Sequence, residues 1–185
     1  MYSPGGFSPG NSTAAFAASG IAGANARYFY DNLSITRLTQ LPYDLTWLTR
    51  ATGQVADGEL LPSEQLGAGG SDSVRGYDPR AASGSQGFLL SNEIRSPSWD
   101  PLHQLGVDIA DSAQLLAFHD YGYVAFENAQ TSLARFTEIQ SVGVGLRYDL
   151  GRYLDVRFDY GWQLERLPGA SKLGNLASIS VTLGN

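Results

Sequence analysis

The sequence contains no cysteine, so it can build neither a disulfide framework nor a thiolate metal site. It also lacks any apolar run of about eighteen residues, which excludes a transmembrane helix but not membrane crossing by strands of about ten residues. Basic residues are few, because 12 Lys and Arg stand against 18 Asp and Glu, for a net charge of −6. We therefore expect no binding to nucleic acid.

Catalytic motifs are missing as well. We find no serine elbow, phosphate-binding loop or metal-ligand spacing. The sequence has only two histidines, His103 and His119. His119 precedes Asp120 on an expected strand, so their side chains point to opposite sides and form no dyad. We predict that the protein is not an enzyme and has no catalytic residues, no metal site and no cofactor.

Glycine and aromatic residues are abundant. The 185 residues include 22 Gly, 10 Tyr and 8 Phe, and 43% are hydrophobic, yet the mean hydropathy is only −0.16. Many aromatics and glycines with few long apolar runs favour β-structure over a helical bundle. The length suits one domain, residues 1–185.

Residues 153–165 alternate strictly between apolar and polar side chains. Alternation with period two predicts a strand with one apolar and one polar face. Such a length exceeds that of a typical soluble strand and suffices to cross a bilayer at a tilt. The apolar face carries Leu154, Val156, Phe158, Tyr160, Trp162 and Leu164, and the other face carries Asp155, Arg157, Asp159, Gly161, Gln163 and Glu165.

Other segments show a similar pattern and are also predicted to be strands. They are residues 26–38, 43–55, 88–95, 114–126, 141–150 and 177–183. Their connections are expected to alternate between tight turns, near Leu41-Pro42 and Gly151-Arg152, and long loops at 58–87 and 128–138. Tight turns on one side and long loops on the other are typical of an up-and-down barrel.

We therefore predict an all-β fold, an antiparallel transmembrane β-barrel that is partial here, with about seven strands. A soluble β-sandwich that acts as a binding module is the alternative, and the long strands with charged faces weigh against it. The first 26 residues end in Ala24-Asn25-Ala26, which mimics a signal-peptidase site. They lack a positive n-region and contain Pro and Gly, so we expect a polar loop there.

One arginine, Arg75, lies in the middle of the glycine-rich segment 58–87, within the sequence Val74-Arg75-Gly76-Tyr77. Phe118, Asp120 and Gly122 follow in the sequence FHDYG, with one predicted strand between the two motifs. Together with the preceding LLPSEQ and GG, these residues resemble the signature region of the haemolysin-activator (ShlB/HecB-type) transporters of two-partner secretion. The resemblance covers essentially the whole chain.

The resemblance implies a bacterial outer-membrane barrel that secretes a large exoprotein through its lumen without ATP. Family members have sixteen strands, a signal peptide, a plug helix and two POTRA domains. The resemblance therefore implies that this chain is the C-terminal part of a longer transporter, and that residues 58–87 are a loop folding into the lumen. The implied partners are the exoprotein, outer-membrane lipids and the barrel assembly machinery. Related barrels insert membrane proteins instead, so an assembly function stays open.

The predicted faces independently suggest a contact for Arg75. On the strand at 114–126, Asp120 shares a face with Phe118 and Gly122, opposite the tyrosine and leucine face that suits lipid. A loop folding into the lumen can bring the Arg75 guanidinium against the Asp120 carboxylate, as a charge-assisted pair. Glu93 and Arg95 face the same side of their strand and are candidates to join this network.

Overall fold

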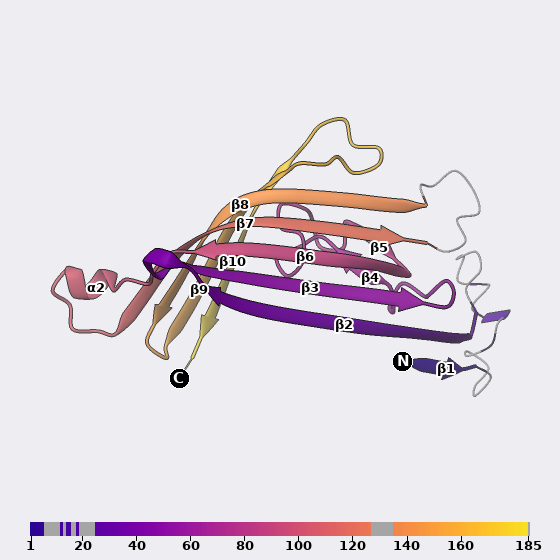
Figure 1. Cartoon of the computed structure of the whole chain (residues 1–185), viewed down its shortest axis with the longest axis horizontal. Coiled ribbons are helices and arrows are strands. Elements are labelled where there is room, and N and C mark those ends of the chain that lie inside the picture. The colour runs from indigo at the N-terminus through magenta and orange to yellow at the C-terminus, as the bar shows by residue number, and fades with distance from the viewer. Residues whose placement is uncertain (6–11, 13, 16–17, 19–24, 127–134, 185) are drawn as a thin grey trace.

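The computed structural model describes residues 1–5, 12, 14–15, 18, 25–126 and 135–184. Its main feature is one antiparallel sheet of eight strands in the order β1-β2-β3-β6-β7-β8-β9-β10 (Figure 1). These strands are β1 (Tyr2–Pro4), β2 (Arg27–Gln40), β3 (Thr46–Ala56), β6 (Gln86–Arg95), β7 (Asp111–Ala125), β8 (Phe136–Leu150), β9 (Leu154–Gln163) and β10 (Asn175–Leu183). The described sheet is not closed into a barrel, since its edge strands β1 and β10 each pair with one neighbour and not with each other.

All seven predicted strands are present, and β1 adds an eighth by pairing with the start of β2. The strand predicted from residue 43 begins only at Thr46. Pro42–Asp44 instead forms a short 3-10 turn (η1), in which Tyr43 and Asp44 adopt the positive φ angles of 63° and 57°. A strand cannot contain such residues, so the alternation at its start was misleading.

The tight turns predicted near Leu41-Pro42 and Gly151-Arg152 are confirmed and span residues 41–45 and 151–153, but the predicted alternation of short and long connections is wrong. Residues 96–110 lie on the same side as the tight turns, yet they form a long excursion with the short helix α2 (Pro101–Gln104). The Asp111 carboxylate accepts a hydrogen bond from the Leu102 amide at 3.0 Å, which fixes the start of this helix. Of the long loop predicted at 128–138, Phe136 to Glu138 belong to β8, and residues 127–134 lie outside the described part of the chain.

Most of the N-terminal segment that was predicted to be a polar loop also lies outside the described residues. Within the described part, no helix combines the length and apolar character needed to span a membrane. A sandwich is not found there either, because the only further sheet is the two-stranded β4-β5.

The two faces of the large sheet differ in chemistry, as the alternation predicted. On β7, the even-numbered side chains from Leu116 to Val124 are buried on the concave face, while Leu115 is 54% exposed on the other. The convex face carries many exposed apolar side chains, among them Leu33, Ile35, Phe88, Val144, Phe158, Trp162, Ile179 and Val181. The concave face carries the buried charged side chains of Glu93, Asp120 and Asp159, and it is partly covered by the segment between β3 and β6.

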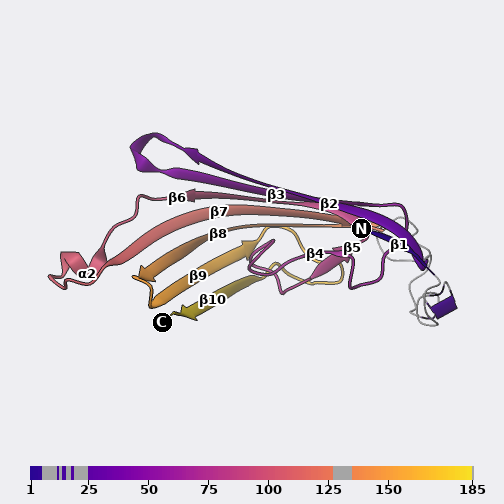
Figure 2. The ribbon, with the colours of Figure 1, turned by 90° about the horizontal axis from the view of Figure 1, so that it is seen from below.

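This covering segment, residues 57–85, is called the inner loop below. It contains the hairpin of β4 (Leu66–Ala68) and β5 (Ala82–Gly84). Figure 2 shows both strands beneath the arch of the sheet, on its concave side, and they contact β6, β7 and β8. The segment between β3 and β6 runs from residue 57 to 85, where the sequence predicted a loop at 58–87.

Candidate functional site

The inner loop is attached to the sheet by a small apolar core. Val74 and Tyr77 from the loop are fully buried, together with Val124 of β7 and Ile139 of β8. Gly122 lets the loop approach this closely, because a Cβ added there would lie 2.9 Å from a methyl carbon of Val74. The predicted residues Val74, Tyr77 and Gly122 thus meet at one place.

Arg75 forms a two-pronged ion pair with Asp120 on the concave face. Its Nε lies 2.7 Å from Asp120 Oδ2, and its Nη2 lies 2.8 Å from Oδ1. The Arg75 backbone N–H also donates to Oδ2 at 3.1 Å. Since Arg75 is 4% exposed and Asp120 is 0% exposed, these charge-assisted bonds lie away from solvent.

The guanidinium has further partners on neighbouring strands. Nη1 lies 2.8 Å from Glu93 Oε1 on β6 and 3.4 Å from Asp159 Oδ1 on β9, while Nη2 donates to Ser91 Oγ at 3.1 Å. The carbon centre of the guanidinium lies 3.6 Å from the centre of the Phe118 ring, a cation–π geometry. One side chain from the loop therefore contacts three strands of the sheet.

Electrostatics keep Arg75 charged in this place. Burial lowers its pKa, but the hydrogen bond and charge of Asp120 and the charges of Glu93 and Asp159 outweigh that effect and raise the pKa above its ordinary value. The carboxylates around Arg75 thus compensate its buried charge.

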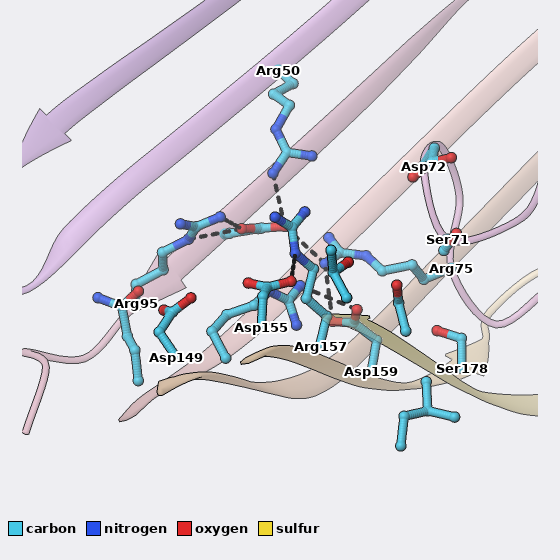
Figure 3. Close-up of a pocket in the computed structure, with 16 residues that line it drawn as sticks. Arg50, Ser71, Asp72, Arg75, Arg95, Asp149, Asp155, Arg157, Asp159 and Ser178 are labelled. Carbon is cyan, nitrogen blue, oxygen red and sulfur yellow. Dashed lines mark hydrogen bonds and ion pairs between the residues drawn. The ribbon is translucent and has the colours of Figure 1, made fainter. Parts of the chain in front are cut away.

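Three more arginines surround these carboxylates. Arg95 and Arg50 contact Glu93, Arg95 at 2.9 Å through its Nε and Arg50 at 3.4 Å through its Nη2. Arg147 holds Asp159 with bonds of 2.9 and 3.1 Å. Glu93 and Arg95, which the sequence suggested as additional members, thus lie in the same network as Arg75. All three residues line a cavity of about 670 Å³ on the concave face (Figure 3).

Gly76 and Tyr77 reach past this network to β8 and β9. Gly76 has a φ of +89° and presses against Gly161 of β9, where an added Cβ would lie 2.7 Å from the Gly76 nitrogen. The Gln163 side-chain amide donates to the Gly76 carbonyl at 2.8 Å. The Tyr77 hydroxyl lies among backbone groups of Gln140 and Glu165. Burial raises the pKa of Tyr77, and the two backbone hydrogen bonds offset part of this rise.

The structure thus brings together all seven residues of the two predicted motifs. Sequence reasoning missed several residues that complete the site, namely Ser91, Arg147, Asp159, Gly161 and Gln163. All five lie on the polar faces of predicted strands, so the side of the sheet that each faces could be predicted from the alternation. No motif in the neighbouring sequence indicates that they contact the loop that carries Arg75. His119 faces away from Asp120 and contacts the Gln140 side chain, in agreement with the prediction that no dyad forms.

Among the described residues, no group of three or more His, Asp or Glu side chains is arranged to hold a metal ion. The carboxylates of the site are instead occupied by arginines. The arrangement can hold a loop in place and can respond to changes in charge.

Comparison with known proteins gives a consistent result. The family model described as haemolysin secretion/activation protein ShlB/FhaC/HecB matches residues 6–148. The chain is 32% identical over 118 residues to the heme/hemopexin transporter protein HuxB of Haemophilus influenzae (strain 86-028NP), covering 61% of this chain and 20% of that protein. It is 26% identical over 132 residues to the outer membrane transporter CdiB of Dickeya dadantii (strain 3937), covering 71% and 22%.

The matched part of the chain thus spans about a fifth of the length of these curated relatives. Proteins of this family are outer-membrane transporters of two-partner secretion, which secrete a partner exoprotein, and not enzymes. The matched residues include the inner loop and the strands β2 to β7, together with most of β8. The chain belongs to the haemolysin secretion/activation protein (ShlB/FhaC/HecB) family of outer-membrane transporters.

Proposed function

We propose that this chain forms part of a transmembrane barrel in the bacterial outer membrane, and that a large exoprotein passes along its concave face. In this proposal the inner loop is held in the lumen by Arg75 and Asp120 and sets whether the conduit is open. The observation that carries the proposal is the buried pairing of Arg75, at the tip of a long loop, with Asp120 on the sheet wall.

The convex face supports placement in lipid. Strands β7 and β8 each have 15 residues, enough to cross a bilayer at a tilt. Aromatic rings gather on the convex face toward the inner-loop end, as in the girdles of outer-membrane barrels. The ring pairs are Phe88–Tyr121, Tyr123–Phe136 and Tyr160–Trp162, with centroids 5.3, 5.7 and 4.8 Å apart.

A closed barrel requires strands beyond the eight described here. Open sheet edges leave backbone N–H and C=O groups unpaired, which lipid does not tolerate. The curated relatives are several times longer than the matched part of the chain, which leaves room for such strands in a complete transporter. We propose that outer-membrane lipids contact the convex face, and that the barrel assembly machinery inserts the complete barrel.

The proposed lock follows from the cost of a buried charge. If the loop left the wall, Asp120 would lose the cation that compensates it, whereas Glu93 would keep Arg95 and Arg50. Breaking one partner of such a buried pair costs about 3–5 kcal/mol. The docked loop is therefore stable at rest, and an incoming exoprotein must supply interactions that replace those of Arg75.

The test is secretion of the cognate exoprotein by the native transporter that contains this chain. We expect Arg75→Ala to reduce secretion at normal barrel levels in the outer membrane. Arg157→Ala is the matched control, because Arg157 also faces the concave side but its side chain is 61% exposed. Unchanged secretion with Arg75→Ala would refute the lock. If outer-membrane proteins in general decline while secretion persists, membrane-protein assembly is the function instead.

A further inference from the structure

Strands β8 and β9 are paired over most of β8 but not over its N-terminal residues, and Tyr77 lies at the point where the pairing stops. Their register runs from Leu150↔Leu154 to Ser141↔Gln163. One more bond follows, from the Leu164 amide to the Gln140 carbonyl at 2.7 Å. Beyond it, β8 continues to Phe136 with β7 as its partner, while the chain after β9 turns away toward β10.

The Tyr77 hydroxyl takes the place of the next backbone hydrogen bond between the two strands. The amides of Gln140 and Glu165 both donate to its oxygen at 3.3 Å. The hydroxyl oxygen lies 2.6 Å from the Glu165 carbonyl, to which it donates its single proton. The hydroxyl thus satisfies main-chain groups of β8 and of the segment just after β9, where the two chains no longer pair with each other.

The wall beside this point is shaped to receive the loop tip. Gly143 and Gly161 face each other across β8 and β9. A Cβ at Gly143 would overlap the Phe118 ring, and one at Gly161 would lie 2.8 Å from the Gly76 Cα. Side chains are excluded from this part of the wall, so the backbone of the loop can bring Tyr77 between the two strands.

We propose that Tyr77 is a positioning residue that closes the end of the seam between β8 and β9, and that this seam loosens when the inner loop leaves. This attachment carries no charge and is separate from the Arg75 network. The inference rests on the proposed docking of the loop, but not on transport through the barrel. Loop release would then widen the mouth of the conduit as well as clear its lumen.

The experiment is hydrogen–deuterium exchange of the native transporter in detergent micelles, resolved at the amides of Gln140 and Glu165. In Tyr77→Phe we expect these amides to exchange about two- to tenfold faster, as the loss of one net hydrogen bond predicts. Tyr121→Phe is the matched control, because it removes a hydroxyl that donates to the Glu138 side chain of the same strand β8 at 3.0 Å. That control should leave both amides unchanged.

A second variant reaches the same state without altering Tyr77. Gly161→Ala pushes the loop tip off the wall and should also accelerate exchange at Gln140 and Glu165. Gly53→Ala is its control, since an added Cβ there meets nothing within 4 Å. Unchanged exchange in both Tyr77→Phe and Gly161→Ala, or equal acceleration in the controls, would overturn the inference. Faster exchange with undiminished secretion would support the role of Tyr77 at the seam between β8 and β9, and would show that docking of the inner loop is not needed for transport.

Discussion

Removing Arg75 should cost more docking free energy than removing Asp120. In Arg75→Ala the Asp120 carboxylate, which is 0% exposed, loses the cation paired with it, while Glu93 keeps Arg95 and Arg50. In Asp120→Ala the guanidinium keeps Glu93 at 2.8 Å and Asp159 at 3.4 Å, and remains over Phe118. The arginine therefore has substitutes for its lost partner, whereas the described part of the chain offers Asp120 no second cation.

The expected magnitudes follow from this difference. An uncompensated buried charge costs about 3–5 kcal/mol, so Arg75→Ala should shift the docking equilibrium of the inner loop by roughly two to three and a half orders of magnitude. Asp120→Ala should fall well below that range. The double variant should cost less than the sum of the two single variants, because the second substitution removes a charge that the first left unpaired.

The assay is native-state hydrogen exchange over residues 66–84 of the full transporter, which reports the free energy of loop opening directly. Substitutions in the docked loop and wall should change that free energy without changing exchange in β2 or β10. Equal costs for the two single variants would refute the reasoning, because they imply that Glu93 and Asp159 do not hold Arg75 once Asp120 is removed. Strict additivity in the double variant would also refute it, because it implies that Arg75 and Asp120 are not coupled.

Two further predictions use matched pairs of side chains, and a third uses pH. Phe158→Lys on the convex face should destabilise the membrane-inserted barrel by about 2–4 kcal/mol, whereas Ser180→Lys on the concave face should cost little, as heat-modified mobility in gels will measure. Ser91→Ala should weaken loop docking by about 1 kcal/mol because Ser91 Oγ accepts from Arg75. Ser141→Ala should be neutral in the same exchange assay, since its buried Oγ has no hydrogen-bond partner among the described residues. Alkaline pH should release the loop, because burial raises the pKa of Tyr77 and the docked loop therefore favours the neutral phenol. This contribution to docking is complete below pH about 10, the ordinary pKa of tyrosine, and is lost as the pH rises through the raised pKa. Tyrosinate absorbance will follow this step, and Tyr77→Phe will abolish it.

Much of the sheet was predictable because its two faces lie in different surroundings. Period-two alternation marked every long strand, and it correctly turned Asp120 and Glu93 toward one side. It failed at Tyr43, where the positive φ after Pro42 delays the start of β3 to Thr46 although the alternating pattern already begins at residue 43. The excursion at 96–110 was missed because its short helix is capped by Asp111, a residue of the following strand.

The site was less predictable than the sheet. The tight turn at Gly151-Arg152 fixes the register of β8 and β9, which sets Gly145 opposite Asp159 and leaves Arg147 two residues away on the same face. That part of the network could have been found from the sequence. The contact of Arg75 with Asp159 joins residues 84 positions apart, and it depends on the curvature of the sheet, which no local pattern specifies.

The paired glycines Gly143 and Gly161 have a consequence for optical measurements. Where they stand, the wall is a single main chain thick, and Tyr160 and Trp162 flank Gly161 on the convex side with their rings edge to face. A shift of the loop tip against Gly161 is therefore transmitted through one peptide unit to an indole on the opposite surface. Trp162 is therefore placed to act as an intrinsic fluorophore that reports, from the convex face, whether the inner loop is docked against the concave face.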